Sequence, residues 1–445
     1  MNRKIMLQGL AIALLGFLFQ IGLQQGMRSH ALQGMYYQQW SSDYLMQTVS
    51  MEDLRDAPLE TLSHIHIQPP ALDAVRAILA AVQDSPDPHT LVRNVDRALY
   101  VLWALLYGLL GAIVFLWLSQ MTGAWYAAVA ALVFLAHPAS IFYATLLDGT
   151  LLSAVLILWA YYLVWTIRMT PEKQVGALCA AVLALFFTRS IFQWPAVLVF
   201  ALSLILLKAP KRNIIVFLIV CGGLAGLYTG KQYYQFGIAS TSSFTGLNLE
   251  NSIGRSSMHD YWTYLDRIAI SETQGNSLPA VLVRKKKLEG TPNFNHAAYL
   301  TLNKRLIQAY KEDLAAMPPV QLVLSYLQNT RIYFTPSSRY SNHVIVDRIP
   351  WRNFYDRIFS FPILPGLIVL AAIVWFLRAQ RSDYLAGTAL AFPGLFIFLI
   401  SVLFEKGENM RFKFFLEPVV FVLIASQLFV AVEHLYRKVR SRRSS

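Results

Sequence analysis

Ten apolar runs divide the chain, and with flanking semi-polar residues each reaches the length of about 20 residues that a helix needs to cross a bilayer. The runs are Ile5–Leu23, Leu99–Leu118, Ala124–Ala136, Leu151–Ile167, Val175–Phe187, Ala196–Leu207, Ile214–Thr229, Phe359–Leu377, Tyr384–Phe404 and Phe415–Val432. This pattern predicts an all-α polytopic membrane protein with about ten transmembrane helices. The first run follows Arg3 and Lys4 and lacks a small-residue cleavage site, so we expect an uncleaved helix rather than a signal peptide.

Basic residues between the runs predict the topology. With the N-terminus in the cytosol, the predicted cytosolic segments contain Arg168, Lys173, Lys208, Lys211, Arg212, Arg378, Arg381, Arg437, Lys438, Arg440, Arg442 and Arg443. Cytosolic loops carry the excess of Lys and Arg in membrane proteins. We therefore expect both termini in the cytosol, in a protein of the cytoplasmic (inner) membrane.

Two long segments then face outward and define three parts of the chain. An N-terminal transmembrane module spans 1–230 and includes a first outer loop at 24–98. An extracytoplasmic segment of mixed composition follows at 231–357. A C-terminal transmembrane module with a basic cytosolic tail covers 358–445.

Within the outer segments, two stretches predict helices outside the spans. In the first, apolar residues recur at helical spacing at Leu72, Val75, Ile78, Leu79 and Val82. Because Asp73 and Arg76 fall opposite them, this helix is of the amphipathic kind that lies along a membrane surface. The apolar stretch Val320–Phe334 contains polar residues and predicts an interfacial or packed helix. The basic run Arg284–Lys287 is either a solvated charge run or a contact with lipid headgroups or a lipid-linked phosphate.

Composition supports lipid as the main solvent. The 445 residues are 56% hydrophobic and only 14% charged, against roughly 25% charged in soluble domains. The formal net charge of +13 does not indicate nucleic acid, because much of it flanks apolar spans. Cys179 and Cys221 lie inside apolar runs, where we expect small buried side chains rather than a disulfide or zinc framework.

Acidic and histidine side chains collect on the predicted outer side. Asp43 lies early in the first outer loop, and His64 and His66 follow it at a spacing that makes a weak metal pair without a third ligand. Asp148 falls in the short hairpin between two spans, where an acid is costly unless it is paired or solvated. Asp148-Gly149-Thr150 is also good helix-capping sequence, so a functional role and a capping role both stay open.

Two basic sites also lie on the outer side. Arg189 ends the fifth span, and its position opposes the positive-inside bias that a snorkelling arginine would follow. In the last outer loop, Arg411 and Lys413 alternate with aromatic residues and lead into a span. Arginine matches a phosphate well because its planar fork offers several donors. The alternative for Arg411 is an ion pair with Glu405 or Glu408, and both roles are compatible.

Five segments in order resemble a known family, the polyprenyl-phosphate-sugar-dependent glycosyltransferases of the GT-C superfamily, in the protein-mannosyltransferase-like and aminoarabinose-transferase-like branch. The segments are Asp43-Tyr44 with His66…Pro69-Pro70, His137-Pro138…Tyr143…Asp148, Phe187-Thr188-Arg189, Gln232–Gly237 with Ser240–Ser242 and Gly246–Leu249, and Gly407-Glu408…Arg411-Phe412…Glu417-Pro418. The family often has two adjacent acids in its first loop, whereas Asp43 stands between Ser42 and Tyr44.

The resemblance implies an inverting sugar transfer from a polyprenyl-phosphate donor to an acceptor lipid, glycan or protein on the outer side of the membrane. It makes Asp43 the candidate base and Asp148 a second acid that orients the acceptor or a divalent metal. Arg411 and Lys413, with Arg189, would hold the donor phosphate, while His66 and Glu408 are candidate acceptor or loop residues. The implied partners are the donor, membrane lipid and the acceptor, with no nucleic acid and no certain cofactor.

Three other functions fit parts of the pattern. A ligase or polymerase of lipid-linked glycans would use similar lipid phosphates, but its main outer loop would lie between late spans. A transporter or flippase often shows inverted repeats and broken helices, which the sequence does not display. An assembly factor would keep the fold without the base, and loss of activity on replacing Asp43 would argue against it.

Overall fold

The described part of the chain is mainly helical. The computed structural model describes residues 3–29, 41–83, 85–167, 174–255, 258–267, 278–340, 349–378 and 381–443. Within these residues there is no β-strand, and a single bridge pairs Lys286 with Pro292. The predicted all-α class is confirmed.

Six of the described helices are long and apolar enough to cross a membrane. They are α1 (Arg3–Ser29), α5 (Pro88–Met121), α8 (Gly149–Ile167), the continuous helix α11 (Lys211–Phe217), η3 (Leu218–Gly222) and α12 (Gly223–Phe236), α21 (Arg381–Phe404) and α22 (Asn409–Arg443). A seventh span is formed if α19 (Arg352–Ile358) and α20 (Ile363–Arg378), which are bent by 54° at a short break, cross as one.

The predicted number of ten spans is not confirmed. Three of the predicted runs form apolar helices that are shorter than a full span, namely α6 (Ala124–Leu135), α9 (Val175–Thr188) and α10 (Trp194–Leu206). The multi-pass helical architecture itself is confirmed, because each of the ten apolar runs coincides with a helix.

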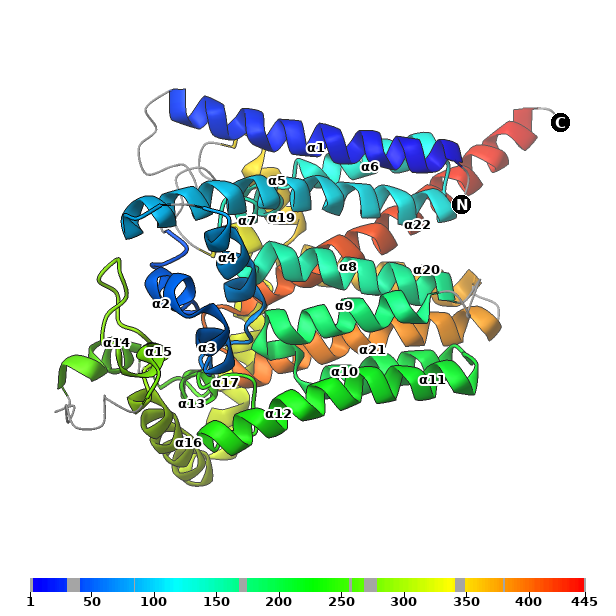
Figure 1. Cartoon of the computed structure of the whole chain (residues 1–445). Coiled ribbons are helices and arrows are strands. Elements are labelled where there is room, and N and C mark those ends of the chain that lie inside the picture. The colour runs from blue at the N-terminus through cyan, green and yellow to red at the C-terminus, as the bar shows by residue number, and fades with distance from the viewer. Residues whose placement is uncertain are drawn as a thin grey trace.

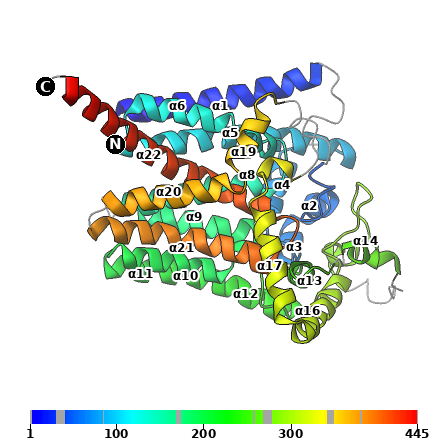
Figure 2. The ribbon, with the colours of Figure 1, turned by 180° about the vertical axis from the view of Figure 1, so that it is seen from behind.

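The long helices lie side by side, with their axes roughly aligned, and the short helices gather at one end of this layer (Figures 1 and 2). The short helices are α2 (Met51–Asp56), α3 (Pro58–Ser63), α4 (Ala71–Ala81), α7 (Pro138–Tyr143), α13 (Thr245–Ser252), α14 (Met258–Arg267), α15 (Ala280–Val283), α16 (Ala298–Ala316), α17 (Pro319–Tyr333) and the turns η2 (Ser190–Phe192) and η5 (Ser337–Arg339). The start of α1 and the end of α22 lie together at the opposite end (Figure 1).

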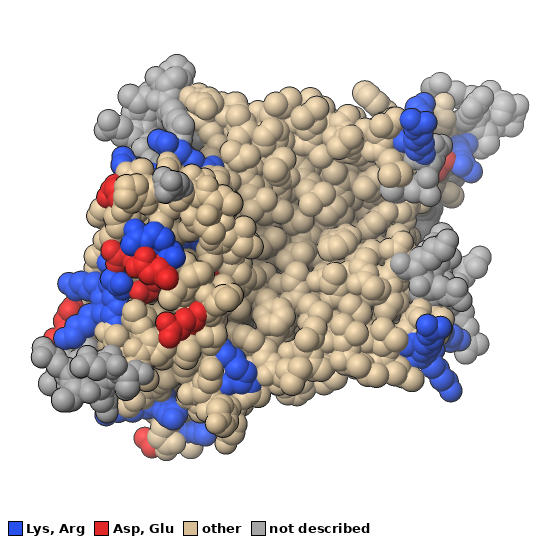
Figure 3. Space-filling view, in the orientation of Figure 1, with Lys and Arg blue, Asp and Glu red and all other residues tan. Residues whose placement is uncertain are grey.

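Charge follows the same division. Figure 3 shows a band free of charged side chains between two charged ends, and acidic residues gather mainly at the end that bears the short helices. Arg168 and Lys173 lie outside the described residues, and the side chains of Arg378, Arg381, Lys438, Arg440, Arg442 and Arg443 are not described either.

Close contact between α1 and α5 depends on glycine. A Cβ atom on Gly108 would lie 2.2 Å from the carbonyl oxygen of Ala13, and one on Gly16 would lie 2.9 Å from the Cα of Gly108. Small residues allow helix backbones to touch in this way inside a membrane. Helix α8 lies deeper in the layer and packs against α5, α9 and α22, so the residues at its start are held from several sides.

The predicted amphipathic helix forms as α4, but its charged side faces inward. Asp73 and Arg76 are buried, whereas Ile78 is 65% exposed and Val82 is 72% exposed. Both charged residues find partners inside the protein. The predicted placement of this helix along a membrane surface stays a prediction.

The second predicted surface helix forms as α17, which runs across the ends of the long helices in Figure 2. It exposes one apolar stripe at helical spacing, made by Val320, Val323, Leu324 and Leu327. The buried Asn329 donates hydrogen bonds to the carbonyls of Ser252 and Val402. This arrangement fits the predicted interfacial or packed helix. Helix α12 continues to Phe236, beyond the predicted module boundary at residue 230.

The two cysteines lie in neighbouring helices. Both are buried and free, and the thiol of Cys221 approaches the carbonyl of Cys179 at 3.7 Å. The prediction of small buried side chains without a disulfide is confirmed.

Candidate functional site

Three separate segments meet at the carboxylate of Asp148. Its Oδ2 atom lies 2.5 Å from Nη2 of Arg411, at the start of α22, and 2.8 Å from Nη2 of Arg189, at the end of α9. All three side chains are at least 95% buried. We call Asp148, Arg189 and Arg411 the arginine cluster. The sequence singled out each of these residues separately, and the structure brings them together.

Asp148 also caps its own turn. Oδ1 accepts a hydrogen bond from the backbone N–H of Thr150, and Oδ2 accepts one from the Thr150 hydroxyl, both at 2.9 Å. Burial by itself raises the pKa of this carboxyl, but the guanidiniums of Arg411 and Arg189 outweigh burial and hold the pKa below its usual value. The capping role and the ion-pair role therefore coexist, with the carboxylate ionised.

Every guanidinium nitrogen of Arg411 has a protein partner. Nε donates to the Thr150 hydroxyl at 2.8 Å, and Nη1 donates to Tyr340 at 2.9 Å and to Glu408 at 2.8 Å. Nη2 also approaches Oε1 of Gln47 at 3.4 Å. The predicted ion pair with Glu408 is confirmed. The Glu408 side chain remains 35% exposed, so it is the partner of Arg411 that a ligand could displace most easily.

Gln47, in the segment before α2, contacts the arginine cluster. Its Oε1 atom also accepts a short hydrogen bond from Nη1 of Arg189. Sequence reasoning missed Gln47, because an uncharged residue outside any motif carries no signal. It also missed Tyr340, whose hydroxyl donates to Glu408 at 2.9 Å.

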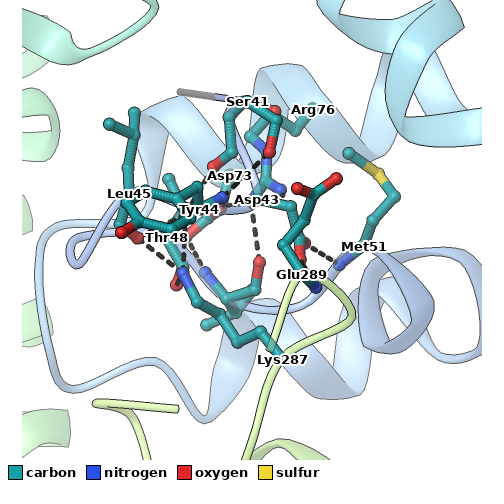
Figure 4. Close-up of polar contacts among 12 residues, drawn as sticks. Ser41, Asp43, Tyr44, Leu45, Thr48, Met51, Asp73, Arg76, Lys287 and Glu289 are labelled. Atoms are coloured by element: carbon teal, nitrogen blue, oxygen red, sulfur yellow. Dashed lines mark hydrogen bonds and ion pairs between the residues drawn. The ribbon is translucent and has the colours of Figure 1, made fainter. Parts of the chain in front are cut away.

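Asp43 forms a second, fully buried cluster (Figure 4). Its Oδ1 atom accepts hydrogen bonds from the backbone N–H of Met51 at 2.7 Å and from Nη2 of Arg76 at 3.3 Å. Nη1 of Arg76 lies 2.5 Å from Asp73, and the backbone N–H of Glu289 lies 3.4 Å from Oδ2 of Asp43. The side chain of Asp43 has no exposed surface. Among the described residues, no hydrogen bond or ion pair joins Asp43 directly to Asp148, and their predicted proximity stays a prediction.

The basic run Arg284–Lys287 supports this second cluster. Arg284 pairs with Asp53 at 3.0 Å and with Glu52 at 2.5 Å. Lys287 is buried, and its Nζ donates to the carbonyls of Leu45 at 2.6 Å and Thr48 at 3.2 Å. Burial lowers the pKa of Lys287 to about 7. Neither the solvated-run interpretation nor the headgroup interpretation describes Arg284 and Lys287, whereas Lys285 and Lys286 are exposed.

His66 joins segments that are distant in the sequence and stays neutral. Its Nδ1 atom lies 2.9 Å from the Ser243 hydroxyl, and its backbone N–H donates to Asn295 at 2.8 Å. Burial lowers the pKa of His66 to about 3. Its ring also meets the ring of Phe236 edge-on, so the contacts observed for His66 are hydrogen bonds and ring packing within the protein. Among the described residues, no three His, Cys, Asp or Glu side chains are arranged to hold a metal ion.

Lys413 is not brought to the arginine cluster. Its Nζ lies 3.1 Å from Glu417, and it donates to the carbonyl of Phe359 at 2.5 Å. Glu417 also accepts from Ser337 at 2.6 Å and lies 3.9 Å from Nε2 of His137. Residues 411 and 413 are two apart on a helix, so their side chains point to different sides.

A cleft of about 270 Å³ lies beside the arginine cluster. Ser190, which follows Arg189, and Phe412, which follows Arg411, both line it. Its polar wall is formed by Ser190, Gln193, Ser242, Thr245, Asn248 and Glu405, and its apolar wall includes Phe396, Ile400, Phe404 and Phe412. The sequence marked Glu405 only as an alternative partner for Arg411, and the structure instead directs it to this cleft.

No protein-family model matches the chain, and no curated protein shows significant sequence similarity to it.

Proposed function

We propose that this protein is an inverting membrane glycosyltransferase that moves a sugar from a polyprenyl-phosphate donor to an acceptor on the extracytoplasmic side. The observation that carries the proposal is the arginine cluster beside an amphipathic cleft, at the end of the helical layer where the short helices gather. Such a position suits a substrate with a lipid tail and a polar head.

The orientation follows from charge. The start of α1 and the end of α22 lie at the same end of the molecule. The exposed Lys211, Arg212 and Arg437 belong to the segments predicted as cytosolic. The positive-inside rule then assigns this end to the cytosol and the arginine cluster to the outer face. The proposed location is the cytoplasmic (inner) membrane, with the arginine cluster facing the periplasm or exterior.

In the proposed reaction the acceptor hydroxyl attacks the anomeric carbon of the sugar while the bond from that carbon to the phosphate oxygen breaks. The hydroxyl proton passes to a carboxylate, for which Asp43 is the proposed base. The polyprenyl phosphate leaves with its negative charge stabilised by Arg411 and Arg189. A phosphate reaching Arg411 would replace the partly exposed Glu408.

The base assignment requires a movement. Asp43 lies beneath the turn that contains Glu289 and is closed off from solvent. For an acceptor to reach Asp43, the segment between Lys286 and Pro292 must lift away. The proposal therefore includes a conformational change. In the resting protein Asp43 is shielded from solvent, and substrate binding exposes it.

Incubation of the purified full-length protein with a panel of polyprenyl-phosphate sugars and membrane extract tests the function. The expected result is a sugar-bearing product with inverted anomeric configuration, absent with Asp43→Asn. Failure to transfer any sugar, with donor lipids recovered intact, would overturn the proposed activity. Transfer of a preassembled glycan instead would favour the ligase alternative.

A further inference from the structure

Glu405 is a buried carboxyl that forms no ion pair with any residue that the structure describes. It lies in the turn between α21 and α22 and is only 6% exposed. Within the described part of the chain, its carboxylate accepts one hydrogen bond, from the backbone N–H of Lys406 to Oε1 at 3.0 Å. No described residue donates a hydrogen bond to the other oxygen. A buried carboxyl left in this state costs free energy unless something else satisfies it.

The turn holds Glu405 in place. Nδ2 of Asn409 donates to the carbonyl of Glu405 at 2.8 Å and to that of Ser401 at 2.6 Å. Gly407 adopts a φ of +99°, a conformation that favours glycine. The carboxyl is therefore presented to the cleft by a constrained turn rather than by a free loop.

The opposite wall is also fixed and also offers free polar atoms. Helix α13 packs so closely on α16 that a Cβ on Gly246 would lie 2.6 Å from the carbonyl oxygen of Asn303. Asn303 accepts from the backbone N–H of Gly246 at 2.6 Å. Two residues further on, Asn248 lines the cleft, and among the described residues no hydrogen bond is made by its side-chain amide.

The chemistry of the lining selects the ligand. Neither lysine nor arginine is among the described residues that line the cleft, and a phosphate is bound best by cationic donors, so the phosphate of a lipid substrate belongs outside it. Carboxylate and amide groups facing aromatic side chains suit a neutral ring that bears hydroxyl groups. The volume of about 270 Å³ lies just below the roughly 300–1,000 Å³ of drug-sized ligand pockets, which suits one ring and not a chain of sugars.

We propose that this cleft binds the single sugar ring of the lipid-linked substrate, and that Glu405 and Asn248 determine which sugar is accepted by hydrogen bonding to its hydroxyl groups. The proposal rests on the proposed function for the reaction that follows binding. The sugar lies in the cleft, and its phosphate projects toward the neighbouring arginine cluster. Burial raises the pKa of Glu405 well above its usual value.

Equilibrium binding to the full-length protein in detergent tests the proposal. The probes are radiolabelled polyprenyl phosphate and the same lipid carrying glucose, galactose, mannose or arabinose. The wild type should bind at least one sugar-bearing lipid more tightly than the bare lipid. Glu405→Leu and Asn248→Ala should weaken that binding about tenfold to a hundredfold and leave bare-lipid binding unchanged.

A matched control and a stability measurement separate binding from folding. Glu433→Leu makes the same chemical change in a side chain that pairs with Arg437 far along α22, and it should leave both affinities unchanged. Because Glu405 forms no ion pair with any described residue, Glu405→Leu should keep or raise the melting temperature. A structural role would instead lower it.

Several outcomes would overturn the proposal. The first is that the wild type binds the bare lipid and every sugar-bearing lipid with equal affinity. The second is that both variants bind the sugar-bearing lipid as tightly as the wild type does. The third is that the variants lose equal affinity for the bare lipid and the sugar-bearing lipid. Sugar transfer by the wild type with both variants unaffected would remove the cleft assignment and keep the proposed function. Selective binding of a sugar-bearing lipid, without transfer of the sugar to any acceptor, would keep the cleft assignment and remove the proposed function.

Discussion

Nη2 of Arg411 lies 2.5 Å from Oδ2 of Asp148, although 263 positions separate the two residues in the chain. The pair joins the start of the last helix to the start of α8. Arg189 occupies the same carboxylate oxygen from a third segment. One ionised acid thus holds two guanidiniums side by side, at the place where the proposed donor phosphate would bind.

Removing Arg411 should affect stability and donor use together. Arg411→Ala removes one of the two guanidiniums that pair with the buried Asp148, and loss of one member of a buried ion pair costs on the order of 3–5 kcal/mol. Arg411→Lys keeps the charge but loses the planar fork, and we expect donor affinity to fall about tenfold to a hundredfold. Melting temperature and donor dependence should be measured for each variant.

Glu408→Ala is the control for that experiment. If Arg411 only pins the loop, Glu408→Ala reproduces the stability loss of Arg411→Ala and donor dependence does not change in either variant. A wild-type donor dependence in Arg411→Ala would end the phosphate assignment, whatever happened to stability.

Replacing Asp43 should abolish transfer with little loss of stability. Asn at this position keeps an acceptor for the backbone N–H of Met51, and Arg76 keeps its closer partner Asp73. Loss of a general base typically lowers the rate by about 10²–10⁴. Asp73→Asn is the matched control, because it should lower the melting temperature while the folded fraction retains activity. Equal activity losses in both variants would contradict the base assignment.

Lys287 should make stability depend on pH. Burial lowers its pKa to about 7 in the folded protein, against about 10.4 in an unfolded chain. Between these values the unfolded chain binds a proton that the folded protein does not, so stability rises with pH, by at most about 1.4 kcal/mol per pH unit. Melting temperatures from pH 7 to 9.5 should rise more steeply for the wild type than for Lys287→Met. Parallel curves would contradict the neutral, buried lysine.

The contact between α1 and α5 should tolerate no side chain at Gly108. A Cβ there would lie 2.2 Å from a backbone oxygen, and overpacking of this kind costs about 1–3 kcal/mol. Gly108→Ala should therefore lower the melting temperature. Gly22→Ala in α1 is the control, because nothing lies within 4 Å of its added Cβ and alanine favours a helix. Similar effects of both substitutions would argue against the close contact.

Reporter fusions test the topology. A fusion near Ser277 and one after Ser445 should report opposite sides of the membrane, because 231–357 and the C-terminal tail are predicted to lie on different sides. The same side for both fusions would reject the topology and, with it, the outward orientation of the arginine cluster.

The amino-acid sequence by itself determined the helical membrane architecture. A long apolar run favours a helix inside lipid because only internal hydrogen bonds satisfy its backbone there, and this is a local property. Each predicted run accordingly coincides with a helix. Span number was harder to predict, because α6, α9 and α10 are shorter than a bilayer crossing and neighbouring segments decide how they are accommodated.

Tertiary structure decided the candidate site. The sequence marked each member of the arginine cluster separately, because charged residues near spans are costly. Their shared ion pairs depend on packing between distant helices. The inward orientation of the charged side of α4 also could not be predicted without the fold. Burial of Asp73 and Arg76 becomes favourable only because they pair with each other and Arg76 pairs with Asp43. The sequence carried no signal for Gln47, or for the Glu405 carboxylate oxygen to which no described residue donates. The surroundings of a side chain are set by segments hundreds of residues away.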